Sequence, residues 1–213
     1  MKILIFANGE NNLLREELEE ILPIDKIICA DGGTKFALNM NLIPDIIVGD
    51  MDSISHEIID KIKREKIEWK IYPKEKDETD LELAVKEALK YKPKVIYFVG
   101  LLGGRIDHTL SNLFFLESIK ERGIEVIILD RKIRITLMIG EEEKIFWGNE
   151  GEIISLIPLS KKVESITLKG LKYPLNNETL YRKLTRGISN EFISKEAKIK
   201  ISSGTLIIIH FLS

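Results

Sequence analysis

Two aspartates, Asp50 and Asp52, stand two positions apart directly after residues 46–49, an apolar run that predicts a buried strand. In doubly wound α/β proteins, ligands bind beyond the carboxyl ends of the strands. Two carboxylates at such a place, followed by the small polar Ser53, suit a hard divalent cation such as Mg²⁺, which prefers oxygen ligands. The alternative is an Asp-rich turn that merely follows a strand. We favour the cation site because further clusters of this kind occur elsewhere in the chain.

A second cluster, Asp31-Gly32-Gly33, closes one predicted strand and opens a predicted helix. Glycines at such a turn allow backbone amides to approach a phosphate group, and the amino end of the helix adds a favourable partial charge. The same tripeptide is also ordinary turn chemistry. For this cluster alone, both interpretations stay open.

A third cluster occupies residues 74–80. Asp77 or Thr79 is suited to cap the helix that follows, and Asp80 in the first helical turn suits the helix dipole. Asp80 is equally suited to be a third carboxylate for the cation of the two aspartates above. Mg²⁺ takes few protein carboxylates and completes its octahedron with water and phosphate oxygens.

A fourth cluster, residues 100–108, combines three glycines with Arg105, Asp107 and His108, between a predicted strand and a predicted helix. Open backbone amides followed by a guanidinium suit a polyphosphate, because the guanidinium binds phosphate oxygens through two parallel hydrogen bonds. Asp107 and His108 would also serve as helix caps. Capping leaves the glycines and Arg105 unexplained, so we favour ligand binding.

Several common kinds of site are missing from the sequence. There is no Gly-Lys dipeptide and therefore no Walker A loop, and no G-x-G-x-x-G fits the first strand-to-helix turn. The histidines, His56, His108 and His210, lack the spacing of zinc ligands, and no G-x-S-x-G nucleophile elbow occurs. Together the clusters predict a site for a magnesium-bound polyphosphate nucleotide without a P-loop, where catalysis is mainly positioning and charge neutralisation.

The elements that must position these clusters alternate between strands and helices up to about residue 137, which predicts a mostly parallel sheet with helices on both faces. The predicted strands are residues 3–7, 26–30, 45–48, 68–72, 94–99 and 125–129. The predicted helices are residues 12–21, 34–40, 55–66, 79–91 and 106–122. Each cluster therefore follows a predicted strand.

The remainder of the chain consists of short alternating or β-branched runs separated by glycines, which predict a small antiparallel β-sandwich. These runs are residues 145–147, 152–156, 163–168, 198–202 and 205–211. We expect Trp147 in the core of the sandwich. The change of pattern predicts two domains, an α/β nucleotide- and magnesium-binding domain at residues 1–138 and an all-β domain at residues 139–213.

The composition is that of an ordered globular chain. The 213 residues include 44% hydrophobic and 31% charged residues, and the net charge of −2 gives no electrostatic basis for non-specific nucleic-acid binding. No apolar segment has the length of a membrane span, and Cys29 alone cannot form an internal disulfide. We expect a cytoplasmic protein with neither nucleic-acid nor membrane partners.

The motifs, in this order, resemble those of the thiamine pyrophosphokinase (thiamine diphosphokinase) family. The shared motifs are Asp-Gly-Gly at residues 31–33, Pro-Asp at 44–45, Gly-Asp-x-Asp-Ser at 49–53, Lys-Asp-x-Thr-Asp at 76–80 and Gly-Gly-Arg-x-Asp-His at 103–108. Residues 170–175 and 185–191 also look similar to the family. The resemblance therefore covers nearly the whole chain.

The resemblance implies Mg²⁺-dependent transfer of a pyrophosphoryl group from ATP to the hydroxyl of thiamine, with attack at the β-phosphorus and release of AMP. It implies that Mg²⁺ is held by Asp50, Asp52 and Asp80. The implied ATP-binding residues are Asp31, Gly32, Gly33, Gly104, Arg105, Asp107 and His108. The implied catalytic residues are Asp77, Asp80 and Arg105, and Asp77 and Asp80 both stay open as acceptors of the hydroxyl proton.

The family resemblance also implies a thiamine-binding role for the β domain, in which Ser189 and Asn190 would face thiamine. It implies a homodimer whose site is shared between subunits. The sequence also admits two rival functions. A phosphatase of the haloacid dehalogenase type would use the first aspartate as nucleophile, but Ser53 and Ile54 follow the motif and no Asp-Asp pair occurs. An inactive nucleotide- or thiamine-binding module is disfavoured because all the carboxylates are retained.

Overall fold

The computed structural model describes residues 1–10, 12–50, 64–65 and 67–213. Contacts divide the chain into two compact units. The first comprises Met1–Asn112 and Ile128–Arg131, and the second comprises Leu113–Ile127 and Lys132–Ser213. Most of the predicted helix at 55–66 lies outside the described residues. Asp52, which precedes this helix in the sequence, lies outside them too.

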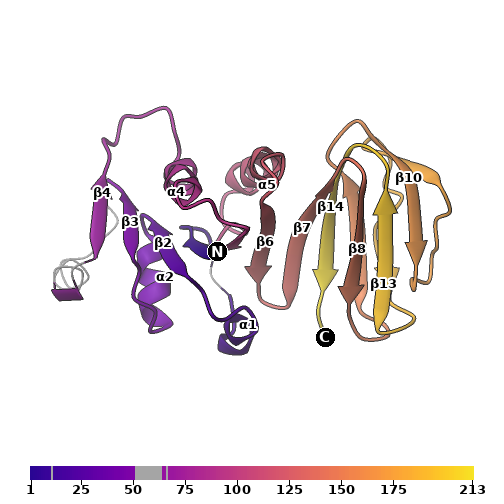
Figure 1. Ribbon diagram of the computed structural model, residues 1–213, viewed down its shortest axis with the longest axis horizontal. Coiled ribbons are helices and arrows are strands. Elements are labelled where there is room, and N and C mark those ends of the chain that lie inside the picture. The colour runs from indigo at the N-terminus through magenta and orange to yellow at the C-terminus, as the bar shows by residue number, and fades with distance from the viewer. Residues whose placement is uncertain (11, 51–63, 66) are drawn as a thin grey trace. The chain divides into compact units, whose positions relative to one another are not determined.

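The first unit is built on parallel strands in the order β5-β1-β2-β3-β4 (Figure 1). These strands are β1 (Lys2–Phe6), β2 (Lys26–Ala30), β3 (Ile46–Gly49), β4 (Glu68–Ile71) and β5 (Val95–Val99). Most side chains of β1, β2 and β3 are buried, because a parallel sheet is covered on both faces and its strands are apolar throughout. The structure confirms the predicted strands of this sheet to within one residue.

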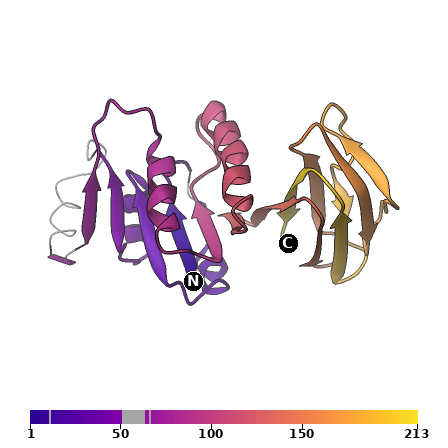
Figure 2. The same cartoon turned by 45° about the horizontal axis from the view of Figure 1, so that its top comes forward.

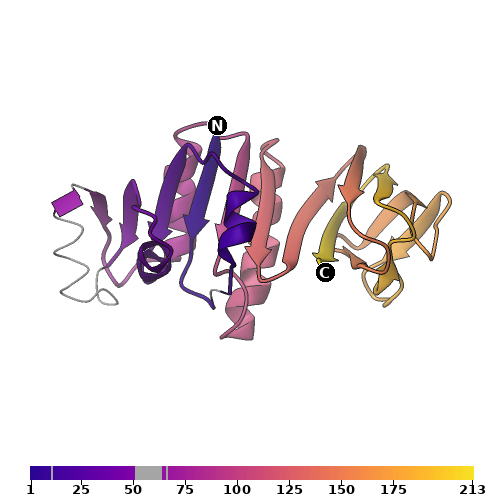
Figure 3. The same cartoon turned by 90° about the horizontal axis from the view of Figure 1, so that it is seen from below.

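Helices cover both faces of this sheet. Helix α2 (Gly33–Asn39) packs on β1 and β2, and α4 (Asp80–Leu89) packs on β2 and β3. Figure 3 shows α2 and the short α1 (Arg15–Glu19) in front of the strands and α4 behind them. Helix α1 is shorter than predicted: it begins after Leu14, whose backbone is extended (ψ 154°), and ends before its C-cap residue Glu20.

Two elements are shared between the units. Helix α5 (Ile106–Lys120) is divided after Asn112, and strand β6 (Glu125–Asp130) is divided after Ile127. None of the helices in the described part of the chain is long and apolar enough to cross a membrane.

The second unit contains two antiparallel sheets, in the orders β12-β9-β14-β7 and β11-β10-β13-β8 (Figure 2). Their strands are β7 (Ile133–Ile139), β8 (Glu142–Trp147), β9 (Ile153–Pro158), β10 (Lys162–Lys169), β11 (Glu178–Tyr181), β12 (Asn190–Glu191), β13 (Glu196–Ile201) and β14 (Thr205–Phe211). One apolar cluster joins both sheets, with Leu156 and Ile208 from the first and Ile166 and Ile199 from the second. The predicted β-sandwich is confirmed.

The expectation that Trp147 lies in the sandwich core is wrong. Its exposed fraction is 68%. Strand β8 alternates between partly buried and exposed residues, and Trp147 has the same parity as the exposed Ile145, whereas Phe146 packs against the core. The sequence pattern also missed β7, β11 and β12, and β7 runs across the expected boundary near residue 138.

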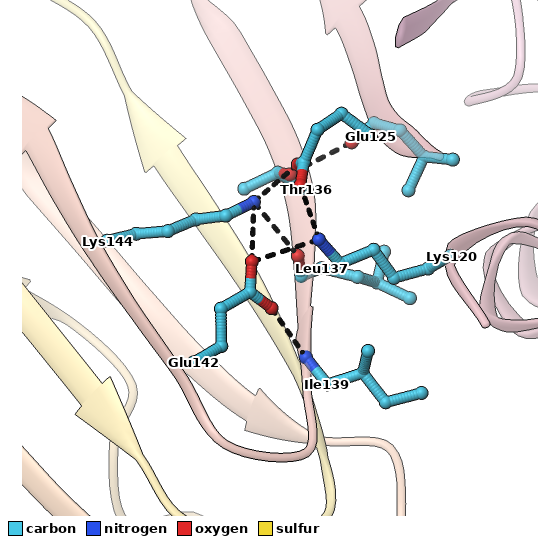
Figure 4. A network of polar contacts seen from close by, with 8 residues as sticks. Lys120, Glu125, Thr136, Leu137, Ile139, Glu142 and Lys144 are labelled. Atoms are coloured by element: carbon cyan, nitrogen blue, oxygen red, sulfur yellow. Dashed lines mark hydrogen bonds and ion pairs between the residues drawn. The ribbon is translucent and has the colours of Figure 1, made fainter. Parts of the chain in front are cut away.

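A polar network fastens the end of α5 to β6 and β8 within the second unit (Figure 4). The buried Lys120 ammonium bonds Glu125 at 2.6 Å and Glu142 at 2.9 Å, and Lys144 contacts the same two carboxylates at 2.5 and 3.3 Å. Burial by itself lowers the pKa of Lys120, but its bonds to Glu125 and Glu142 outweigh burial and raise the pKa above its ordinary value. Lys120 therefore stays charged in the folded chain.

The only cysteine, Cys29, lies in β2 with no exposed surface. Burial raises the pKa of its thiol far above the ordinary value, and a hydrogen bond with Thr34 only partly opposes this shift. Cys29 is therefore a core residue.

Candidate active site

The loops that follow the five parallel strands β1 to β5 surround one cavity. These strands run in the same direction, so their carboxyl ends meet at one edge of the sheet, where α/β proteins bind ligands. The cavity has a volume of about 610 Å³ and is lined by residues of the first unit alone. Its polar and charged lining residues are Asn8, Glu10, Asp31, Asp50, Lys74, Lys76, Glu78, Thr79, Asp80, Arg105, His108 and Asn112.

Asp31 follows β2 directly and lines this cavity, although only 7% of its surface is exposed. Its backbone is left-handed (φ +43°), a conformation that aspartate tolerates better than most residues. Three hydrogen bonds hold it there: its N–H donates to the Val48 carbonyl at 2.8 Å, and its carbonyl accepts from the N–H and hydroxyl of Thr34 at 3.0 and 2.8 Å. The side-chain Oδ1 is buried and has no hydrogen-bond partner in the part of the chain that the structure describes.

Gly32 and Gly33 allow close packing at the start of α2 and do not line the cavity. A Cβ on Gly33 would lie 2.2 Å from the Phe6 carbonyl oxygen, and one on Gly32 would lie 2.1 Å from the Asn8 side chain. Their absent side chains let the turn after β2 approach the end of β1. Their part in nucleotide binding stays a prediction.

The structure brings two of the three predicted metal ligands to the cavity. Asp50 follows β3, Asp80 is the first residue of α4, and both line the cavity. Asp52 lies outside the described residues. The Lys76 ammonium donates to Asp80 Oδ1 at 2.7 Å, so a cationic side chain already holds this carboxylate in place.

Thr79 caps helix α4, as one of the two predicted alternatives. Its hydroxyl accepts from the Glu82 N–H at 3.2 Å, and the Glu82 carboxylate accepts from the Thr79 N–H at 2.7 Å, which is a capping box. This cap fixes the start of the helix and with it Asp80. Asp77 is exposed and is not among the residues that line the cavity.

The loop between β5 and α5 presents Gly104 and Arg105 to the cavity, and the first turn of α5 presents His108. The Arg105 guanidinium donates to Asp107 through Nε (3.1 Å) and Nη2 (2.5 Å). This pairing lowers the pKa of Asp107 to about 2. Asp107 does not itself line the cavity. Because both side chains are mostly exposed, the guanidinium can exchange Asp107 for a phosphate group.

Sequence reasoning missed Glu10 as a residue of the site. Its carboxylate accepts from the Gly104 N–H at 3.1 Å, although the two residues are 94 positions apart in the chain. The backbones of the two loops are also bonded, from the Gly9 N–H to the Gly100 carbonyl (2.8 Å) and from the Glu10 N–H to the Leu102 carbonyl (3.0 Å). The only signal in the sequence was the small turn after β1.

Carboxylates outnumber cationic side chains around the cavity. The carboxylates are those of Glu10, Asp31, Asp50, Glu78 and Asp80, and the cations are Lys74, Lys76 and Arg105. No three His, Cys, Asp or Glu side chains of the described residues already form a metal cluster. The donor set nevertheless fits a hard cation, because its groups are oxygen ligands and the buried Oδ1 of Asp31 lacks a partner.

Ser189 and Asn190 belong to the second unit. Asn190 is buried, and its side-chain amide forms two hydrogen bonds with the backbone of Tyr173. Its Oδ1 accepts from the Tyr173 N–H at 2.9 Å, and its Nδ2 donates to the Tyr173 carbonyl at 2.8 Å. Ser189 is exposed in a left-handed conformation (φ +57°), and its N–H donates to the Ser155 hydroxyl at 3.0 Å. Asn190 therefore shapes the segment, and Ser189 projects from it.

Two family models match consecutive parts of the chain. Residues 20–128 match the model described as thiamin pyrophosphokinase, catalytic domain. Residues 134–206 match the model described as thiamin pyrophosphokinase, vitamin B1 binding domain. The first match contains most of the loops around the cavity, and the second contains Ser189 and Asn190.

The chain is 34% identical over 205 residues to thiamine pyrophosphokinase of Bacillus subtilis (strain 168), with 96% of each chain covered. It is 27% identical to thiamin pyrophosphokinase 1 of Caenorhabditis elegans, covering 96% of this chain and 87% of the relative.

Among solved structures, the fold matches thiamine pyrophosphokinase from B. subtilis with a TM-score of 0.89 at 32% identity, over 100% of both chains. It matches thiamin pyrophosphokinase from Geobacillus thermodenitrificans with a TM-score of 0.85 at 28% identity, over 100% of this chain and 98% of the other. Sequence and fold agree over the whole length, and the chain belongs to the thiamine pyrophosphokinase family.

Proposed function

We propose that this protein is an enzyme that transfers the pyrophosphoryl group of ATP to the hydroxyl of thiamine with the help of Mg²⁺, giving thiamine diphosphate and AMP. The observation that carries the proposal is the cavity beyond the carboxyl ends of β1 to β5, where carboxylates, a glycine-rich loop and cationic side chains face one space. Membership of the thiamine pyrophosphokinase family supports the same reaction.

We assign the Mg²⁺ ligands to Asp50, Asp52 and Asp80. When bound, the ion would neutralise phosphate charge and make the transferred group more electrophilic. Lys76 positions Asp80 through their 2.7 Å ion pair and adds positive charge beside the phosphates. The capping box of Thr79 fixes the helix end from which Asp80 projects.

The proposed nucleotide site has two kinds of member. Asp31, Gly104, Arg105 and His108 line the cavity, and we assign contacts with ATP to them. The other members act through these residues. Gly32 and Gly33 allow the tight turn at Asp31. Asp107 orients the Arg105 guanidinium. An exposed guanidinium there suits the charge that develops on the phosphate of the departing AMP.

Reaction begins when the thiamine hydroxyl attacks the β-phosphorus of ATP. The hydroxyl proton needs an acceptor within hydrogen-bond reach. Of the two candidates, Asp80 lines the cavity and Asp77 does not, which supports Asp80. Asp77 then acts from outside the cavity, in the loop that precedes α4.

We further propose that residues 1–138 bind ATP and Mg²⁺, and that residues 139–213 bind thiamine, in keeping with the description of the family model matched by residues 134–206. In this proposal two copies form a homodimer with a shared site. Ser189 contacts thiamine, and Asn190 holds the segment through Tyr173. A cytoplasmic location fits a chain whose single cysteine is buried and free.

The test is to incubate the purified chain with ATP, Mg²⁺ and thiamine and to resolve AMP from ADP. We expect AMP to form in step with thiamine diphosphate, and Asp80→Asn to abolish both. ADP as the nucleotide product would contradict attack at the β-phosphorus. ATP binding without any turnover would identify a binding module instead of an enzyme.

A further inference from the structure

Two hydrogen-bond donors of the loop after β5 are bonded to carboxylates of the chain itself. The Gly104 N–H donates to Glu10 Oε1 at 3.1 Å, and the Arg105 guanidinium donates to Asp107. We propose that Glu10 sets the affinity of the cavity for polyphosphates, because its carboxylate takes the place of a phosphate group on the Gly104 N–H and must be displaced by the ligand. This inference rests on the proposed function, in which this loop binds the phosphates of ATP.

The first step is that the fold holds Glu10 against the loop. The Glu10 N–H donates to the Leu102 carbonyl at 3.0 Å, so the backbone places the residue beside the loop. The three atoms nearest to a Cβ built on Gly103 all belong to the Glu10 side chain, at 2.6–2.8 Å. The side chain therefore lies across Gly103 and reaches the Gly104 N–H with its carboxylate.

The second step is the charge that Glu10 brings to this place. The residue is exposed and lines the cavity. Two of the three cationic side chains there are paired with other carboxylates, Lys76 with Asp80 and Arg105 with Asp107. A carboxylate beside a phosphate group repels it, so Glu10 opposes binding of a polyphosphate both before and after it leaves the Gly104 N–H.

The third step is that a phosphate group can take over the same donors. Apart from its chain neighbours, no heavy atom lies within 4 Å of a Cβ built on Gly104, so there is space for a ligand beside this backbone. The contacts of Gly104 with Glu10 and of Arg105 with Asp107 are both exposed. One phosphate group offers acceptors for the amide and the guanidinium together, whereas in the free chain each donor has a separate carboxylate.

The experiment measures binding of inorganic pyrophosphate to the full chain, without divalent metal and at low salt, by isothermal titration calorimetry. We expect Glu10→Gln to bind pyrophosphate about three- to tenfold more tightly than the wild type, because the repelling charge is gone. Glu10→Ala should bind at least as tightly as Glu10→Gln, because it also lacks the competing acceptor.

Glu16→Gln is the matched control. Glu16 is an exposed glutamate in the first turn of α1, and it is not among the residues that line the cavity. The substitution removes the same charge from the same unit, so its pyrophosphate affinity should equal that of the wild type. A gain as large as that of Glu10→Gln would mean that only the net charge matters, and would overturn the inference.

Two further comparisons separate this role from mere support of the loop. The gain of Glu10→Gln should shrink as NaCl is raised from about 0.05 M to about 0.5 M, because salt screens exposed charges. A supporting residue would give the opposite ranking, with Glu10→Ala binding pyrophosphate more weakly than the wild type and Glu10→Gln restoring the affinity. That ranking, or equal affinity of all chains, or no binding by any of them, would overturn the inference.

The outcome is distinguishable from that of the proposed function. If the wild type forms AMP and thiamine diphosphate but Glu10→Gln binds pyrophosphate no more tightly, the inference fails and the function stands. If Glu10→Gln binds pyrophosphate more tightly but no AMP forms with any chain, the inference stands and the function fails.

Discussion

Two of the three cationic side chains at the cavity are paired with carboxylates of their own chain. Arg105 is held by Asp107, and Lys76 is held by Asp80. The pair of Arg105 is the more exposed of the two, and exposed pairs contribute little to stability. The Arg105 guanidinium can therefore leave Asp107 for a phosphate group at small cost, and its effect should be on binding and catalysis rather than on folding.

Replacing the guanidinium tests this assignment. We expect Arg105→Gln to lower kcat/KM for ATP by about 100-fold or more, the size of effect seen when a preorganised charge-stabilising donor is lost. The melting temperature should stay close to that of the wild type, because the side chain is 73% exposed. Steady-state kinetics and a thermal melt measure the two quantities.

Arg15→Gln is the matched control for that substitution. Arg15 is also exposed, and its ion pair is with Glu19 in α1, so both kinetics and stability should match those of the wild type. Full activity of Arg105→Gln would contradict a catalytic role for Arg105.

At the scale of elements, the loops after β1 and β5 form one wall of the cavity because glycine backbones bring them into contact. A Cβ on Gly9 would lie 2.4 Å from the Gly100 carbonyl oxygen and 2.8 Å from that of Leu102. Gly104, in the same wall, has no atom within 4 Å of its virtual Cβ, although its φ is +61°. The two glycines are therefore needed for different reasons.

This difference predicts unequal effects of alanine. Gly9→Ala should destabilise the chain by about 1–3 kcal/mol, as overpacking does, and should raise KM for ATP by separating the loops. Gly104→Ala should lower the free energy of unfolding by only about 1 kcal/mol, the strain of an alanine with left-handed backbone. Urea unfolding ranks the two variants, and a Gly9→Ala variant as stable as the wild type would contradict the close contact.

The network around Lys120 fastens α5, β6 and β8 to one another (Figure 4). We expect Lys120→Met to cost about 1–3 kcal/mol, because the Glu125 and Glu142 carboxylates lose a buried partner and keep Lys144 as their cationic partner. Adding Glu142→Gln should recover part of this loss. The measurement is urea unfolding of the single and double variants.

Lys162→Met provides the comparison for that series. Lys162 pairs with Glu164, and both side chains are largely exposed, so the urea midpoint should not change. Equal effects of Lys120→Met and Lys162→Met would mean that the buried network adds nothing to stability.

At the scale of the whole molecule, the end of the chain is tied to the second unit by a buried pair. His210 Nε2 lies 2.9 Å from Glu152 Oε2, and Ser213 donates to Glu152 through its N–H (2.9 Å) and its hydroxyl (2.7 Å). Burial lowers the pKa of His210 more than the Glu152 bond raises it. Burial raises the pKa of Glu152, but bonds from Ser213 and Asn149 outweigh it and bring the pKa to about 2.

Both shifts predict loss of stability in acid. As the pH falls below about 6.5, the unfolded chain takes up a proton at His210 before the folded chain does, so unfolding becomes more favourable. Glu152 adds a second loss from about pH 4.3 down to its folded pKa, for the same reason. The urea midpoint of the wild type should be lower at pH 5.5 than at pH 7.5. The difference should be smaller for His210→Gln, which keeps a hydrogen-bond donor for Glu152. Equal falls would exclude His210 as the cause.

Much of the fold was predictable because its signals are local. Apolar runs and turn residues predicted the parallel strands, and the motifs predicted that Asp31, Asp50, Asp80 and Arg105 would meet at one edge of the sheet. Glu10 could not be predicted, because only the folded sheet brings it to Gly104. Strand β8 carries apolar residues of both parities, so the sequence could not decide which of them faces the core, and Trp147 was assigned to the wrong side.

The buried Cys29 has a practical consequence. It lies in β2, with no exposed surface and a raised thiol pKa, and thiols react as thiolates. The folded chain should therefore behave as a protein without cysteine toward maleimides and mild oxidants. A single cysteine introduced on the surface can then carry a spectroscopic probe in the otherwise native sequence, and air oxidation should not join copies through Cys29.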